Sequence, residues 1–150
     1  MNSTSERKAA SPAHLGWRLI AAVYDFLPLL ALWFFASGIA LAVTGGALDV
    51  HRLGYKLLVQ VFVLAASAAY FIVSWMRGGQ TVGMKPWRLR VVGADGESIG
   101  FRRALLRFVV AVASLAVLGL GFLWCLVDRE RRGWHDIAAG TLLVRLDKSP

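Results

Sequence analysis

Three apolar stretches constrain the fold of this chain more than any other feature of its sequence. They cover residues 19–43, 57–76 and 108–127. Each is long enough to cross a bilayer, which takes about 20 apolar residues in a helix. Hydrophobic residues make up 57% of the 150-residue chain, which is too apolar for an ordinary soluble domain of this size. The sequence therefore predicts an all-α membrane protein with three hydrophobic helical segments.

The first stretch carries two charges near its start. Arg18 stands directly before it, and Asp25 lies about two helical turns further on, so both side chains fall on nearly the same face. A carboxylate facing lipid costs about 3 kcal/mol or more. Pro28, one turn beyond Asp25, bends the helix and frees a backbone carbonyl. We therefore expect a polar notch that faces protein or water, with Asp25 as the candidate proton or ion site.

The second stretch carries uncharged polar residues along one face. Gln60, Ser67 and Ser74 recur every seven residues, and four alanines flank Ser67 in the sequence. Small and polar side chains drive the association of membrane helices, because lipid supplies no hydrophobic force between them. These three residues predict a helix-packing seam, formed within the chain or against a second copy. A polar path that serves Asp25 is the alternative.

The polar segment between the second and third stretches predicts a small β-hairpin on the membrane surface. From residue 87 to residue 91, apolar residues alternate with arginines, which is the periodicity of a strand. Asp95 and Gly96 form a turn signal, and Ile99 and Phe101 fit a short return strand. Near the C-terminus, residues 142–146 also fit a strand.

The charged and reactive residues exclude several classes of function. The net charge of +8 comes from basic residues at the edges of the apolar stretches, where lipid headgroups explain them, so we expect no nucleic-acid partner. Cys125 is the only cysteine, which rules out an internal disulfide. His135 lies beside Asp136, but no serine or cysteine is placed to act as a nucleophile. We therefore expect no catalytic residues, no metal ligands and no cofactor.

The domain boundaries follow from the same patterns. Residues 1–15 are predicted to be a disordered polar tail, residues 16–146 a single membrane domain, and residues 147–150 a short tail. The N-terminal tail and residues 77–107 are more basic than the loop between the first two stretches. Because positive segments stay inside, the N-terminus is expected to be cytoplasmic.

The third stretch has two interpretations. Hydropathy favours a full crossing, which would place the C-terminal tail outside, and this is the outcome that we expect. The alternative is a turn back at Gly119 and Gly121, shielded by neighbouring helices. That turn would bring Asp136 near Arg18 and lay residues 142–146 beside the strand at residues 87–92.

These motifs resemble the RDD family of small bacterial membrane proteins, from residue 16 to residue 144. The resemblance is carried by Arg18 and Asp25, residues 79–85 (GQTVGMK), residues 89–92 with Asp95 and Gly96, Arg107, and residues 132–141 (RGWHDIAAGT). The family is named for one arginine and two aspartates, which implies Arg18, Asp25 and Asp136 as its signature residues here. Met84–Lys85 departs from the Gly-Lys of many members. The resemblance implies a multi-pass protein of the bacterial cytoplasmic (inner) membrane.

Two functions remain open from the sequence. The first is a non-enzymatic membrane protein that self-associates or binds other membrane proteins, with the lipid bilayer, a second copy or another membrane protein as partner. The alternative is a cation or proton transporter, antiporter-like, in which Asp25 titrates inside an oligomer. Ion antiport has been suggested within the family that the chain resembles.

Overall fold

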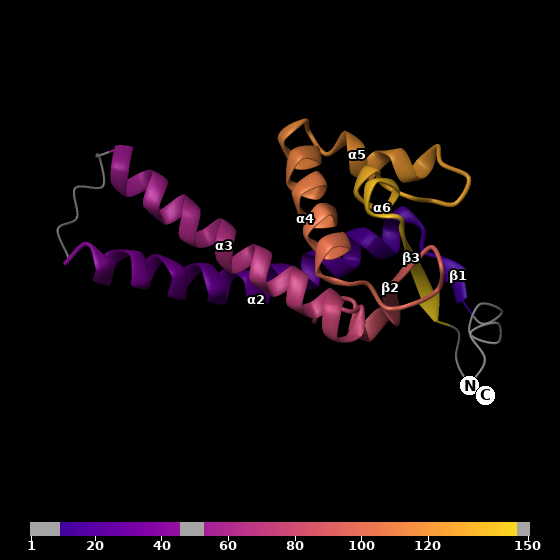
Figure 1. Cartoon of the computed structure of the whole chain (residues 1–150), viewed down its shortest axis with the longest axis horizontal. Coiled ribbons are helices and arrows are strands. Elements are labelled where there is room, and N and C mark those ends of the chain that lie inside the picture. The colour runs from indigo at the N-terminus through magenta and orange to yellow at the C-terminus, as the bar shows by residue number, and fades with distance from the viewer. Residues whose placement is uncertain (1–9, 46–52, 147–150) are drawn as a thin grey trace.

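The computed structural model of the chain describes residues 10–45 and 53–146. Two long helices, α2 (Leu15–Val43) and α3 (Leu53–Gly78), run side by side in opposite directions and project from a small unit of short helices and strands (Figure 1). Within the described residues, both are long and apolar enough to cross a membrane. The first two predicted segments are therefore confirmed as long apolar helices. The loop between them and the outer parts of both predicted tails lie outside the described residues.

Local hydrogen bonds explain where α2 begins and ends. The ring of His14 accepts a hydrogen bond from the backbone N–H of Gly16 at 3.1 Å, which satisfies one free donor of the first turn. At the other end, the hydroxyl of Thr44 donates to the carbonyls of Ala40 and Leu41. Pro28 lies inside the helix, as the sequence indicates.

The third apolar stretch is not one helix. α4 (Phe101–Ala116) is followed by α5 (Leu120–Leu123) and the 3₁₀ turn η2 (Trp124–Leu126), and the chain bends by 110° between α4 and this pair. Leu118 and Gly119 make the bend with φ angles of 59° and 74°. The prediction of a continuous helix over residues 108–127 is therefore wrong, and the structure does not confirm a third full crossing.

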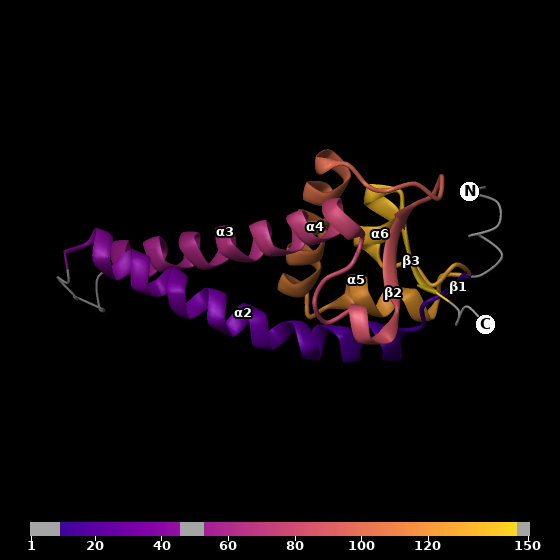
Figure 2. The same cartoon turned by 90° about the horizontal axis from the view of Figure 1, so that it is seen from below.

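The sheet shows where the chain goes after this bend. Strands β1 (Ala10–Pro12), β3 (Thr141–Leu146) and β2 (Leu89–Gly93) form an antiparallel sheet in the order β1-β3-β2. β2 and β3 pair from Leu89 opposite Arg145 to Gly93 opposite Thr141. Figure 2 shows this sheet at the end of the molecule away from the free ends of α2 and α3. The turn-back alternative placed residues 142–146 beside this strand, and the structure agrees with it.

Two sequence predictions about strands need correction. The strand at residues 89–93 exists, but its partner is β3 instead of residues 99–101, because Phe101 already begins α4. β3 offers a longer register than two return residues could, so more ladder hydrogen bonds form. Part of the predicted disordered tail is also ordered, since Ala10–Pro12 pair with β3.

The hydrophobic core cluster lies where α2 and α3 meet the small unit. Leu89, Val91 and Leu143 from the sheet pack with Trp75 of α3 and Phe108 of α4, and all five are buried. Along the long helices, by contrast, large apolar side chains such as Phe34 remain exposed. The molecule therefore consists of an apolar helix pair, open to its surroundings, and a packed unit with its own core.

Candidate functional site

Asp25 lies in a closed cage of hydrogen-bond donors. Its side chain is buried in the third turn of α2. The hydroxyl of Tyr70 donates to Oδ1 at 2.5 Å, and the hydroxyl of Thr81 donates to Oδ2 at 2.5 Å. The backbone N–H of Gly83 also donates to Oδ1, at 2.8 Å. Both oxygens of the carboxylate are therefore satisfied by α3 and by the segment that follows it.

Contacts with β2 and with α2 position this segment, residues 79–85. The carbonyl of Gly79, whose φ angle is 67°, accepts a hydrogen bond from the N–H of Val91 at 2.7 Å. The side-chain Nε2 of Gln80 donates to the carbonyl of Leu89 at 2.8 Å. Gly83 then lies directly on α2, where an added Cβ would stand 2.2 Å from the carbonyl oxygen of Ala21. The close approach of this loop to Asp25 thus requires glycine at position 83.

Asp136 is the centre of a second buried cluster. On one side, Nη1 of Arg18 lies 2.7 Å from Oδ2 of Asp136. On the other side, Arg107 pairs with Oδ1 through its own Nη1. Nη1 of Arg107 also donates to the hydroxyl of Thr141, and the N–H of Gly133 donates to Oδ2 of Asp136. This Arg18–Asp136–Arg107 triad joins α2, α4 and α6 (Trp134–Ala139) to the start of β3.

The triad carries more positive than negative charge. Two guanidinium groups flank one carboxylate, and the three side chains are 7%, 3% and 0% exposed for Arg18, Arg107 and Asp136. The guanidinium carbon of Arg107 also lies 5.0 Å from the centre of the Trp75 ring, so α3 contributes a cation–π contact. Because the three charged groups are shielded from water, each depends on the others to compensate its charge.

The predicted polar residues separate into different environments. Arg18 and Asp25 share α2, yet the ion pair of Arg18 is with Asp136, while Asp25 is bound by the loop after α3. In the predicted seam, the hydroxyl of Ser67 accepts a hydrogen bond from Nε1 of Trp33 at 2.8 Å, so it packs against α2. Ser74 is half-buried and Gln60 is exposed.

Three residues have roles in these clusters that the sequence patterns above do not predict. Thr81 and Gly83 belong to the motif at residues 79–85, and a threonine and a glycine directly after an apolar helix are suited to bind a carboxylate on the neighbouring helix. Arg107 is the third of these residues. Its position among apolar residues of α4 was the available signal that it needs a buried acid.

The comparisons with known proteins bear on both clusters. A model described as the RDD family matches residues 12–140, which include Arg18, Asp25, Arg107 and Asp136. The chain belongs to the RDD family. The comparisons with curated proteins and with solved structures gave no match. In this RDD protein, the arginine and the two aspartates implied as signature residues thus form one ion pair and one separate hydrogen-bonded carboxylate.

Neither cluster of the RDD protein holds a recognisable metal site. Over residues 10–45 and 53–146, no group of three or more histidine, cysteine or acidic side chains could bind a metal ion. The expectation of no metal, cofactor or catalytic residue stays a prediction, and so does the role of Asp25 as an ion or proton site. The geometry supports a structural use of Asp25, because its carboxylate already has three donors.

His135 of the RDD protein should make its stability fall in acid. Burial, together with the charge of Arg107, lowers the pKa of His135 to about 3, while Asp136 opposes this shift. Between pH 3 and 6.5, His135 therefore binds fewer protons in the folded protein than in the unfolded chain. Stability from this group is fully present above about pH 6.5 and is lost as the pH falls toward 3.

Thermal unfolding in detergent as a function of pH tests this expectation against a His135→Phe variant. Phenylalanine keeps a ring against Phe122, which lies 4.6 Å away between ring centres. The variant should lose the decline between about pH 6.5 and 4. It should keep the decline in stronger acid, because burial is outweighed by Arg107 and Arg18, which hold the pKa of Asp136 below its usual value in the folded protein only. The same decline above pH 4 in both proteins would assign it to other groups.

Proposed function

We propose that this RDD protein is a non-enzymatic, multi-pass protein of the bacterial cytoplasmic membrane that acts by self-association or by binding other membrane proteins. The N-terminus and the packed unit lie on the cytoplasmic side, in keeping with their excess of basic residues. The observation that carries this proposal is the open apolar surface of the α2–α3 pair. The part of the helix pair that projects from the packed unit exposes large apolar side chains, which include Phe34, Phe35, Val61 and Leu64.

The buried charges support this proposal because the fold itself uses them. Asp25 has three donors, and Asp136 has two guanidinium partners. Both clusters fasten the packed unit to the start of α2 and the end of α3. Folding thus accounts for these buried charged residues, and the surface left for function is the helix pair.

Gln60 makes a second copy of the chain the best-supported partner. This glutamine is exposed on α3, about 10 Å along the helix from its start at Leu53. A primary amide facing hydrocarbon is costly unless it forms hydrogen bonds. In a two-fold symmetric dimer, the amide of each copy can donate to and accept from the same amide of the other.

The test is the oligomeric state of Gln60→Leu, with Val61→Leu as the matched control on a neighbouring face of α3. Interhelical hydrogen bonds in membranes contribute about 0.6 kcal/mol each on average, and Gln60→Leu removes both bonds of the symmetric pair, so it should weaken dimerisation about eightfold. The control should leave it unchanged. Cross-linking in liposomes and sizing in mild detergent measure the dimer fraction. Equal dimer fractions in all three proteins would remove self-association through this face.

A further inference from the structure

We propose that α4 lies flat on the cytoplasmic surface of the bilayer, with its exposed apolar face among the lipid chains and Arg102 at the headgroup phosphates. The third apolar stretch would then be an in-plane lipid-binding element and not a membrane span. This lipid-binding surface, formed by Leu105, Val109, Val112 and Ala116, is distinct from the α3 face proposed for self-association.

α4 and the two long helices run in different directions. Figures 1 and 2 both show α4 running across the direction of the α2–α3 pair, close to the end of α3. α2 and α3 have the length and hydropathy to cross the membrane, so their direction is close to the membrane normal. A helix that runs across them is therefore close to the membrane plane.

The two faces of α4 differ in the residues that they carry. Its buried residues are Ala104, Arg107, Phe108 and Ser114, and two of these four are polar. The opposite face exposes Leu105, Val109 and Val112, with exposed fractions of 39%, 53% and 37%. α4 thus buries Arg107 and Ser114 against the protein and exposes apolar side chains on its opposite face. This distribution suits a helix that is buried in protein on one side and in lipid on the other.

The position of α6 indicates the direction in which the exposed face of α4 points. α4 packs against α6 and α3. In both views α6 lies on the side of α4 away from the free ends of α2 and α3. The face of α4 opposite α6 is therefore turned toward the length of the helix pair, which is where the bilayer lies. The lipid-binding surface continues the apolar surface of that pair.

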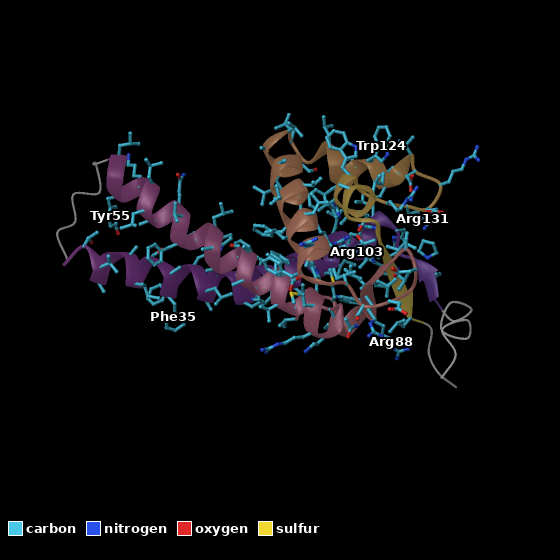
Figure 3. The ribbon with its side chains drawn as sticks, viewed as in Figure 1. Phe35, Tyr55, Arg88, Arg103, Trp124 and Arg131 are labelled. Atoms are coloured by element: carbon cyan, nitrogen blue, oxygen red, sulfur yellow. The ribbon has the colours of Figure 1, made fainter. Side chains whose placement is uncertain are left out.

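Charge and aromatic residues at the ends of this region fit a lipid surface. Arg102 is exposed at the start of α4 and, on a helical projection, lies on the same side as Leu105 and Val109. α4 contains no acidic residue. Beyond the bend, the half-exposed rings of Trp124 and Trp134 lie 6.2 Å apart, and Figure 3 shows Trp124 beside α5. Arginine and tryptophan are the residues that favour the headgroup region.

The depth of α4 in the bilayer tests the proposal. Single cysteines at Leu105 and Ala116, in a Cys125→Ala background, carry a fluorescent label in vesicles of equal parts phosphatidylcholine and phosphatidylglycerol. Lipids with quenchers at different depths then locate each label. An in-plane helix predicts the same shallow depth for both labels. A span would separate them by about 16 Å.

Two control positions calibrate the measurement. A label at Phe35, exposed on α2, should be quenched from deep in the bilayer, and a label at Ser98, exposed in the loop before α4, should not be quenched. Unequal depths at Leu105 and Ala116 would overturn the in-plane placement. Absence of lipid quenching at both would show that water or a second copy covers the face, which also overturns it.

Arg102→Gln tests the headgroup contact separately. Quenching of the Leu105 label by shallow quenchers should be stronger in the mixed vesicles than in pure phosphatidylcholine, and Arg102→Gln should abolish this difference. A difference that persists in the variant, or none in the parent protein, would refute the contact. Neither result depends on dimerisation through Gln60, so failure here leaves the proposed function standing.

Discussion

Asp136→Asn is expected to lower the free energy of unfolding by about 3–5 kcal/mol, the usual cost of removing one partner of a buried ion pair. The substitution keeps the size of the side chain and removes its charge. Arg18 and Arg107 would then share a buried site with no counter-charge, and neither can lose its proton. Thermal or denaturant unfolding of the purified protein in detergent measures the loss.

Asp95→Asn is the matched control. Asp95 pairs with Arg103 at 3.0 Å, but its side chain is 49% exposed, so the same chemical change should lower the stability much less than the change at Asp136 does. The double variant Arg107→Met, Asp136→Asn should lose less than the sum of the two single losses, because the pair interacts directly. If Asp136→Asn were no more damaging than Asp95→Asn, the triad would not be a determinant of stability.

Gly83→Ala is the second change with a large expected effect, about 1–3 kcal/mol or more. Its Cβ would stand 2.2 Å from the carbonyl oxygen of Ala21 and 2.7 Å from the backbone nitrogen of Asp25. Both are main-chain atoms of a helix, so the loop must withdraw and weaken its N–H bond to the Asp25 carboxylate.

Gly38→Ala provides the comparison within the same protein. Position 38 lies inside α2, and a Cβ there would meet nothing within 4 Å. Alanine in the interior of a helix is favoured over glycine by about 0.5–1 kcal/mol, so this variant should be slightly more stable than the parent. Unfolding midpoints of the two variants should therefore shift in opposite directions. A shift of Gly83→Ala in the same direction as Gly38→Ala would disprove the close contact.

Sequence periodicity predicted the elements that depend on local pattern. α2 and α3 follow from the length of their apolar stretches, and β2 follows from alternation at residues 87–91. The need of Asp25 for protein partners was also predictable, because an unpaired carboxylate is not stable in lipid. The identity of those partners was not, since Thr81 and Gly83 lie more than 50 residues away along the chain.

Hydropathy did not predict the bend in the third stretch, because it depends on residue type and carries no information on the direction of the chain. Leu118 adopts a left-handed φ of 59°, which no sequence rule predicts for leucine. Gly121 packs on Ser114 so closely that a Cβ would lie 2.4 Å from the serine hydroxyl, and this contact stabilises the bend. The partner of β2 was missed for a related reason. β3 outcompetes the nearer residues 99–101, and such long-range pairing leaves no local signal.

The place of Asp136 near the end of the chain has a consequence for biosynthesis. The ribosome delivers the N-terminus first, so α2 and α3 emerge well before Asp136 is made. Until then Arg18 is an uncompensated cation at the start of the first apolar helix. A free cation in that position retains its flank on the cytoplasmic side during insertion. In the orientation proposed above, Asp136 therefore neutralises a charge that has first favoured the cytoplasmic side for the start of α2, so the same arginine acts in membrane insertion and then in folding.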